Sequence, residues 1–307
     1  MTAIERITSR KVPLGGPRAM TVHRTLPHRQ RPTIGAWCFA DHYGPDELTM
    51  DVAPHPHTGL QTVSWLFEGE IQHDDAGDHH ALVRPGDLVI MTAGHGISHS
   101  EVSQSTRLHG VQLWTVLPEE HRDSERRLDT YHVPRTTLDC GYAHVFLGSL
   151  LGQESPVQTF TPLLGAEIVL DPGAQLPLEL NPAFEHGVLV DSGRIDVAGV
   201  HIAPTELAYM GIGEQQCTIS NTGDTPARIV VLGGEPFEEP FVMWWNFIGR
   251  SHEEIEQYRE QWQNQDARFG SFEGYRGTGP AWLPAPALPN ATMRARVPSK
   301  PQAQVER

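Results

Sequence analysis

The chain has 307 residues, and its 29 glycines and 25 prolines interrupt it too often for long helical bundles or coiled coils. Hydrophobic residues make up 38% of the sequence, which is enough to build a core and argues against general disorder. The 38 acidic and 23 basic residues give a formal net charge of −15, which repels phosphate, so neither nucleic acid nor an anionic membrane is expected as a partner.

Short apolar segments separated by turn residues fill the first half of the chain. Segment 61–67, QTVSWLF, is rich in the β-branched and aromatic residues that favour strands. Turn residues then separate further strands, which are predicted at 70–73, 88–93 and 111–117. No long helical period intervenes, so this half is predicted to form a β-sandwich or barrel.

The second half of the chain, from about 143 to 234, repeats this pattern. Ser192-Gly193 resembles Glu68-Gly69, and a similar predicted strand follows each pair. The strands predicted here are 184–191, 194–197, 206–211, 217–221 and 227–232. This weak internal repeat indicates two β domains of similar build.

One helix is predicted after the second β region. Ser251 begins a capping box with Glu254, in which the hydroxyl accepts from a backbone N–H and the carboxylate reaches back. Ile255, Tyr258 and Trp262 then form one apolar stripe. We expect this stripe to tie the two β domains together.

The end of the chain has a different composition. After Gly277 it becomes rich in proline and alanine and loses periodicity, so 277–307 is expected to be disordered or to wrap loosely over the surface. Segment 283–288, LPAPAL, is alternatively a docking strip.

Cysteine usage and the first residues bear on the compartment. Cys38, Cys140 and Cys217 are few, odd in number and far apart, which is typical of a reducing compartment without a disulfide framework. The start of the chain lacks the apolar region of a secretory signal, and no apolar run reaches the ~18 residues of a membrane span. The sequence therefore predicts a cytoplasmic protein.

Two doublets of polar residues carry the strongest chemical signal. His55-Pro-His57 and His99-Ser-Glu101 each place two donors at i and i+2, which project from the same face of a strand. Three imidazoles and one carboxylate suit a divalent first-row metal and leave up to two of six positions open for catalysis or reversible ligand binding. The 17 histidines make a chance HxH pair easy, so spacing alone leaves a structural role equally open.

Two residues after the first doublet are candidates for a substrate pocket. Gln61 and Trp65 share the strand parity of His57, so both are expected to face the metal site. The alternatives are that Gln61 hydrogen-bonds within the sheet wall and that Trp65 belongs to the core.

These segments resemble the pirin family of the cupin superfamily. The resemblance rests on HPHTGLQTVSWLFEGEIQHDD and RPGDLVIMTAGHGISHSE, with support from WCFADHYGP, GVQLW and GEPFEEPFVMWWNFIG, and it runs from about residue 10 to 275. It implies an all-β fold of two tandem cupin β-barrels (a bicupin) with a short C-terminal helix. The implied divisions are a metal-binding cupin domain at 1–133, a cupin domain without metal ligands at 134–249, the helix at 250–276 and the tail at 277–307.

The resemblance also implies a site and an activity. The family's metal ligands map onto His55, His57, His99 and Glu101, and its usual metal is iron, Fe(II). Ni, Mn, Cu or Zn would also suit the donor set. Many cupins carry Glu four residues after the second motif His, whereas this chain has Gln61, so Glu101 is the single carboxylate of the constellation.

Several bacterial pirins are quercetin 2,3-dioxygenases, so the first prediction is an oxygenase with one metal per chain. Its substrates would be a small aromatic enol and dioxygen, with Glu101 as the catalytic base. Other family members are regulators, so the alternative is a non-enzymatic, redox- or metal-sensitive protein that binds a protein partner. A metal-dependent isomerase or hydrolase is a third reading.

The second β region and other motifs add no further site. Aligning the two halves places Glu179, Asn181, Thr218 and Ser220 at the positions of the four ligands, so no three-imidazole set is expected there. GIGEQQ at Gly211 lacks the third glycine of a dinucleotide fingerprint, and no nucleotide site is predicted.

Overall fold

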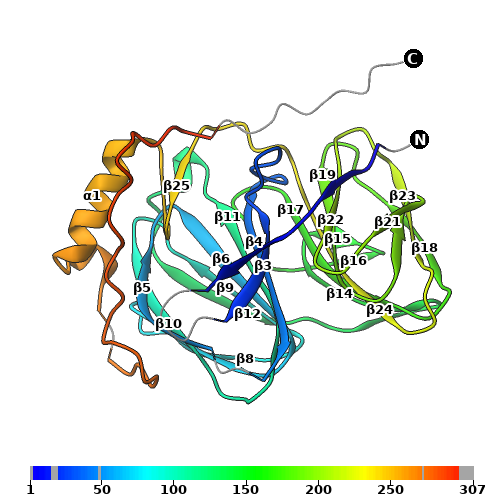
Figure 1. Cartoon of the computed structure of the whole chain (residues 1–307), viewed down its shortest axis with the longest axis horizontal. Coiled ribbons are helices and arrows are strands. Elements are labelled where there is room, and N and C mark those ends of the chain that lie inside the picture. Colours follow the sequence, from blue (N-terminus) through cyan, green and yellow to red (C-terminus); the bar gives the residue numbers. More distant parts are fainter. Residues whose placement is uncertain (1–2, 15–19, 48–49, 272, 297–307) are drawn as a thin grey trace.

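The computed structural model describes residues 3–14, 20–47, 50–271 and 273–296. Two β domains lie side by side, and helix α1 (His252–Gln263) lies on the side of the first domain that faces away from the second (Figure 1). The strands predicted from the sequence occur with their ends shifted by a few residues. Within the described part of the chain, no helix is long and apolar enough to span a membrane.

The first domain combines two antiparallel sheets. The larger has the strand order β12-β9-β6-β11-β4-β3-β2, and the smaller has the order β5-β10-β7-β8. The bounds are β2 Arg10–Pro13, β3 Thr21–Leu26, β4 Trp37–Asp46, β5 Asp51–His57, β6 Leu60–Glu68, β7 Ile71–Asp75, β8 His80–Val83, β9 Asp87–Thr92, β10 Ile97–Ser103, β11 Leu108–Val116 and β12 Arg127–His132, with a 3-10 turn at Glu119–His121.

The second domain has the same plan, with a seven-stranded sheet of order β1-β22-β19-β24-β17-β14-β13 and a four-stranded sheet of order β18-β23-β20-β21. The bounds are β1 Glu5–Ile7, β13 Thr136–Leu138, β14 Gly141–Leu147, β17 Leu163–Leu170, β18 Gln175–Glu179, β19 Glu185–Ser192, β20 Ile195–Val197, β21 Val200–Ile202, β22 Leu207–Met210, β23 Gln216–Asn221 and β24 Ala227–Gly234; β15 Ser149–Leu150 and β16 Gln153–Glu154 form a separate small hairpin.

Strand β1 departs from the predicted division at residue 133. It lies at the start of the chain but pairs with β22 in the second domain's sheet. The start of the chain therefore crosses to the second domain before β2 enters the first. The division of sheets later in the chain falls between β12, which ends at His132, and β13, which begins at Thr136.

The larger sheets of the two domains pack against each other through large buried side chains. Trp37 of β4 is fully buried, and its Nε1 donates to the carbonyls of Leu164 and Gly233 in the second domain, both at 3.1 Å. Strand β6 is buried on both faces along most of its length, because one face points into its own domain and the other points to the neighbouring domain.

A buried polar cluster also crosses this interface. The Asp191 carboxylate of β19 accepts hydrogen bonds at Oδ1 from His42 Nε2, at 2.6 Å, and from His109 Nε2, at 2.5 Å. Arg228 donates to the other oxygen at 3.3 Å and also pairs with Glu167 at 2.8 Å. Burial alone would raise the pKa of Asp191, but the hydrogen bonds from His109 and His42 hold it well below its ordinary value.

Helix α1 packs on the first domain. Ser251 Oγ accepts from the Glu254 N–H, as predicted, but the Glu254 carboxylate accepts from the Arg250 N–H at 2.7 Å and pairs with Arg122 at 2.8 Å. The predicted stripe is buried against the β25–β26 hairpin (Val242–Trp244 and Phe247–Gly249). The prediction that the helix ties both domains together was therefore wrong, and the face-to-face sheets do so instead.

The described part of the tail lies on the chain's own surface, which corresponds to the second of the two predicted alternatives, wrapping over the surface, rather than to disorder. Leu283 donates its N–H to the Pro54 carbonyl at 2.7 Å, and its own carbonyl accepts from Trp262 Nε1 at 2.8 Å. Farther along, Arg296 forms an antiparallel bridge with Phe241. Segment 283–288 thus docks on the chain's own helix, and 297–307 lies outside the described residues.

Candidate metal centre

Strands β5 and β10 are neighbours, and their register brings the two predicted doublets together. His99 lies directly opposite His55, and Ile97 lies opposite His57. The register shifts by one residue between His99 and Glu101, where β5 carries Pro54. Proline has no N–H to donate to the ladder, which is typical of such a bulge.

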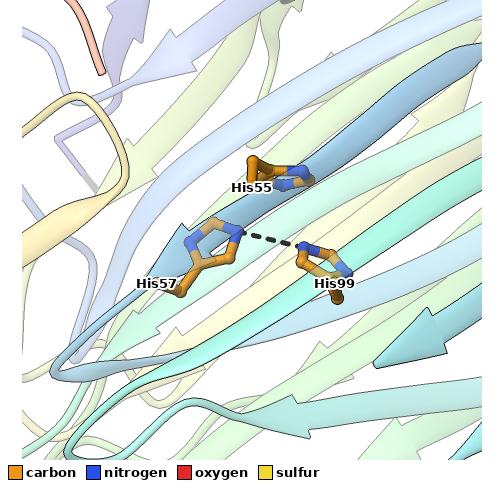
Figure 2. A group of neighbouring side chains, drawn as sticks. All are labelled: His55, His57 and His99. Atoms are coloured by element: carbon orange, nitrogen blue, oxygen red, sulfur yellow. Dashed lines mark hydrogen bonds between the residues drawn. The ribbon is translucent and has the colours of Figure 1, made fainter. Parts of the chain in front are cut away.

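Three imidazoles converge at this point (Figure 2). His57 Nε2 and His99 Nε2 lie 3.1 Å apart, and the ring centroids of His55 and His99 are 4.3 Å apart. His55 Nδ1 is 3.0 Å from the Ala53 carbonyl, which suits a proton on Nδ1. The lone pair of Nε2 is then free to bind a metal. One nitrogen from each ring lies within 4.8 Å of the other two.

Burial sets the charge of these rings. All three are at most 6% exposed. Burial lowers the pKa of His55 to about 4 and holds the pKa values of His57 and His99 well below the ordinary value. The rings are therefore neutral at pH 7, and neutral imidazole is the form that ligates a metal.

Glu101 lies beside this triad rather than in its centre. One carboxylate oxygen of Glu101 and one ring nitrogen each of His99 and His73 lie within 4.8 Å of one another. His55 and His57 do not belong to this group. Ser64 Oγ donates to Glu101 Oε1 at 3.2 Å, and burial raises the pKa of Glu101. The carboxylate is thus held next to one imidazole of the triad, and the four-ligand set stays a prediction.

His73 and Asp75 of β7 form a buried chain behind His99. His99 Nδ1 lies 3.4 Å from His73 Nδ1, and His73 Nε2 lies 3.2 Å from Asp75 Oδ2. With His99 Nε2 on a metal, its Nδ1–H would donate to His73, whose Nε2–H would donate to Asp75. Such outer hydrogen bonds orient metal-bound imidazoles. The sequence signal for this chain is the same-face pair His73-x-Asp75.

The structure does not bring Gln61 and Trp65 to this site. Gln61 donates to Thr92 at 2.9 Å and accepts from Thr115 at 3.3 Å, within the sheet wall. Trp65 Nε1 donates to Glu167 of the second domain at 2.9 Å. The predicted parity failed because the chain turns at Gly59 and enters the other sheet.

Gly59 makes that change of sheet possible. It has a φ of +68°, and a Cβ there would lie 2.5 Å from the Ile248 carbonyl oxygen. After the turn, Thr62 and Ser64 face the domain interior, while Gln61 and Trp65 face outward.

The imidazoles line a cavity of about 420 Å³. Phe39 and Trp114 form an aromatic wall, Gln112 adds an amide, and Leu283 of the tail reaches its lining. Its remaining lining residues include Trp245, Asn246, Met243 and three arginines, Arg10, Arg24 and Arg296. Apart from the ligands, these residues were not predicted as pocket residues, because they come from segments of the chain that lie far apart in the sequence.

A larger hollow of about 760 Å³ lies in the second domain. It is lined in part by Glu179, Asn181 and His186. Among the described residues, no group of three metal-binding side chains lies within that domain alone. The larger hollow lies in the second domain, but the converging metal-binding side chains lie in the first, so the first domain is the better candidate for the metal site.

Comparisons with known proteins agree with this architecture. Residues 19–115 match the family model described as pirin, and residues 165–270 match the pirin C-terminal cupin domain. A Pseudomonas aeruginosa protein, provisionally named as a quercetin 2,3-dioxygenase, is 40% identical over 293 residues, which cover 93% of this chain and 91% of that protein.

Two solved structures extend the comparison. The crystal structure of a quercetin 2,3-dioxygenase from Acinetobacter baumannii is similar with a TM-score of 0.88 and 37% identity, covering 95% of this chain and 97% of that one. The bacterial pirin YhhW from Escherichia coli, solved in complex with nickel(II), shares the fold with a TM-score of 0.59 and 18% identity, covering 76% and 99% of the two chains.

Proposed function

Because this chain belongs to the pirin family of cupin proteins, we propose that it is a mononuclear metal-dependent oxygenase of the quercetin 2,3-dioxygenase type. The observation that carries the proposal is the convergence of three buried, neutral imidazoles on an aromatic-lined cavity. The relatives named as quercetin 2,3-dioxygenases support the choice of reaction.

The donor set fits one divalent metal per chain. His57 Nε2 and His99 Nε2 lie 3.1 Å apart, so both nitrogens could bind the same cation. Nitrogen donors with one carboxylate suit Fe(II), the family's usual metal, and also Ni, Mn, Cu or Zn. Bound there, the metal would supply Lewis acidity toward an enol oxygen and redox access to dioxygen.

The chain's own residues then have separate tasks. Glu101 would accept the enol proton on its carboxylate, and the raised pKa of this buried group suits it to hold that proton. Ser64 keeps Oε1 in place by donating to it. Phe39 and Trp114, stacked with centroids 4.0 Å apart, would pack along an aromatic substrate and exclude water.

The test is oxygen uptake by protein reconstituted anaerobically with one metal at a time, across a panel of flavonols. His99→Ala should lose metal and activity together, because one of three converging donors is removed. Glu101→Gln should keep most of the metal, while turnover per bound metal falls by ~10²–10⁴-fold, as for loss of a general base. Glu179→Gln, in the second domain, is the matched control and should behave as the unmodified protein.

Two results would count against the proposal. Near-normal turnover per metal in Glu101→Gln would eliminate the base role. If the iron-loaded protein consumes no oxygen with any flavonol, neutral or sulfonated, the oxygenase assignment fails, and the regulatory role with a protein partner becomes the better reading.

A further inference from the structure

Positive charge gathers at the cavity that contains the imidazoles, although the chain as a whole carries −15. Arg10 of β2, Arg24 of β3 and Arg296 of the tail all line it. An adjoining hollow of about 360 Å³ shares Arg10 and Arg296 and adds Arg29. Of the described residues that line this second hollow, none is a carboxylate. The region that the two hollows share, next to Arg10 and Arg296, is called the basic mouth below.

A series of ring contacts leads from the imidazoles to Arg24, which lies opposite Arg10 of the basic mouth in the pairing of β2 with β3. His57 meets Trp114 edge-on with centroids 5.1 Å apart, and Trp114 stacks on Phe39 at 4.0 Å. The Arg24 guanidinium lies over Phe39, 4.2 Å from its centroid. A planar ligand placed along this wall would have one end at the imidazoles and the other at the arginines.

The three arginines of the cavity differ in how far their charge is already balanced. Arg24 donates to both oxygens of Asp41, at 2.6 Å each, so its charge is matched. Arg10 donates to a neutral acceptor, the Pro27 carbonyl, at 2.8 Å. Within the described part of the chain, no ion pair joins Arg10 or Arg296 to a carboxylate.

The electrostatics of this pair agree with the geometry. Burial, followed by the charge of Arg24, lowers the pKa of Arg10, and the nearby Asp41 carboxylate offsets only part of this shift. Burial and then the charge of Arg10 lower the pKa of Arg296. The two guanidiniums therefore repel each other in a partly buried place, and an anion between them would relieve that repulsion.

We propose that the basic mouth binds an anionic group of the substrate, such as a carboxylate or sulfonate, at the end remote from the metal-binding enol. The substrate class is then a negatively charged aromatic enol rather than a neutral flavonol. This inference rests on the proposed function for the position of the enol, and Arg10 and Arg296 are its specificity-determining residues.

The test compares two probes that differ by one anionic sulfonate group, quercetin and sulfonated quercetin. Their dissociation constants are measured by calorimetry on the nickel-loaded full chain without oxygen, so that no turnover is needed. The unmodified protein should bind the sulfonated probe about 5- to 20-fold more tightly, the range for two partly screened ion pairs, and the preference should weaken as salt is added.

The double variant Arg10→Gln/Arg296→Gln should lose this preference and keep its affinity for quercetin. Arg24 is left intact because its removal would strand the buried Asp41 carboxylate. Arg194→Gln, an exposed position in the second domain, is the control with the smaller charge change and should keep the preference. Circular dichroism of each variant checks that it is folded.

Equal affinity of the unmodified protein for the two probes, or a preference that survives in the double variant, would overturn the inference. Failure of both probes to bind would overturn it as well. If the preference depends on Arg10 and Arg296 but the iron-loaded protein consumes no oxygen with either probe, the oxygenase proposal is rejected, and the basic mouth remains an anion-binding site without its assignment to an oxygenase substrate.

Discussion

Replacing Asp191 by asparagine should destabilise the whole protein, because this carboxylate is shared between the two domains. The substitution keeps the size of the side chain, so it creates no cavity and tests charge alone. Asp191 is 6% exposed and accepts from His42, His109 and Arg228. Removing one partner of a buried charge cluster typically costs 3–5 kcal/mol.

We expect the lower end of that range, ~3 kcal/mol in the free energy of unfolding. Arg228 keeps its pairing with Glu167, so part of the cost is avoided. Urea unfolding followed by circular dichroism and tryptophan fluorescence measures the change. Asp196→Asn is the matched control, because Asp196 also pairs with a histidine, His201, but that histidine side chain is 52% exposed.

The control should cost less than ~1 kcal/mol, as surface ion pairs do. If Asp191→Asn lowers the free energy of unfolding as little as Asp196→Asn does, the argument that this cluster holds the domains together is refuted.

The same variant has a defined pH dependence. The pKa of Asp191 is lower in the folded protein than in the unfolded chain. Its contribution to the free energy of unfolding is therefore fully present above the ordinary carboxyl pKa of ~3.9 and is lost as the pH falls toward the pKa of the folded state. The stability gap between the unmodified protein and Asp191→Asn should therefore narrow below about pH 4. A gap that widens on acidification would contradict the sign of this linkage.

Two further outcomes concern the metal centre and the tail. His73→Asn should weaken metal binding by ~10–100-fold in a chelator competition, because it removes the group that orients His99. His95→Asn is the control and should keep the affinity, because His95 Nδ1 contacts the Ser124 carbonyl, at 3.2 Å. Equal affinities of the two variants would deny His73 that role. Truncation after Gly277 should lower the free energy of unfolding by ~1–3 kcal/mol, because Trp262 Nε1 loses its acceptor and the tail's packing on the helix is lost, and an unchanged urea midpoint would contradict this.

The sequence alone determined those features that depend on spacing along one strand or one helix. The i, i+2 doublets of His55–His57 and His99–Glu101 each lie on a single strand, so their common face follows from the strand's period of two. The apolar stripe of α1 follows in the same way from the period of the helix, and its three residues are buried as expected.

Only the tertiary structure decided what happens where the chain changes sheet or meets distant segments. Period-two reasoning placed Gln61 and Trp65 in the pocket, but the turn at Gly59 reverses their faces toward the second domain. Arg10 and Arg296 are 286 positions apart in the sequence, and they line one cavity because β2 and the tail both reach it. Parity and period are local properties of the backbone, whereas a pocket or a domain interface depends on long-range packing, which spacing along the chain does not encode.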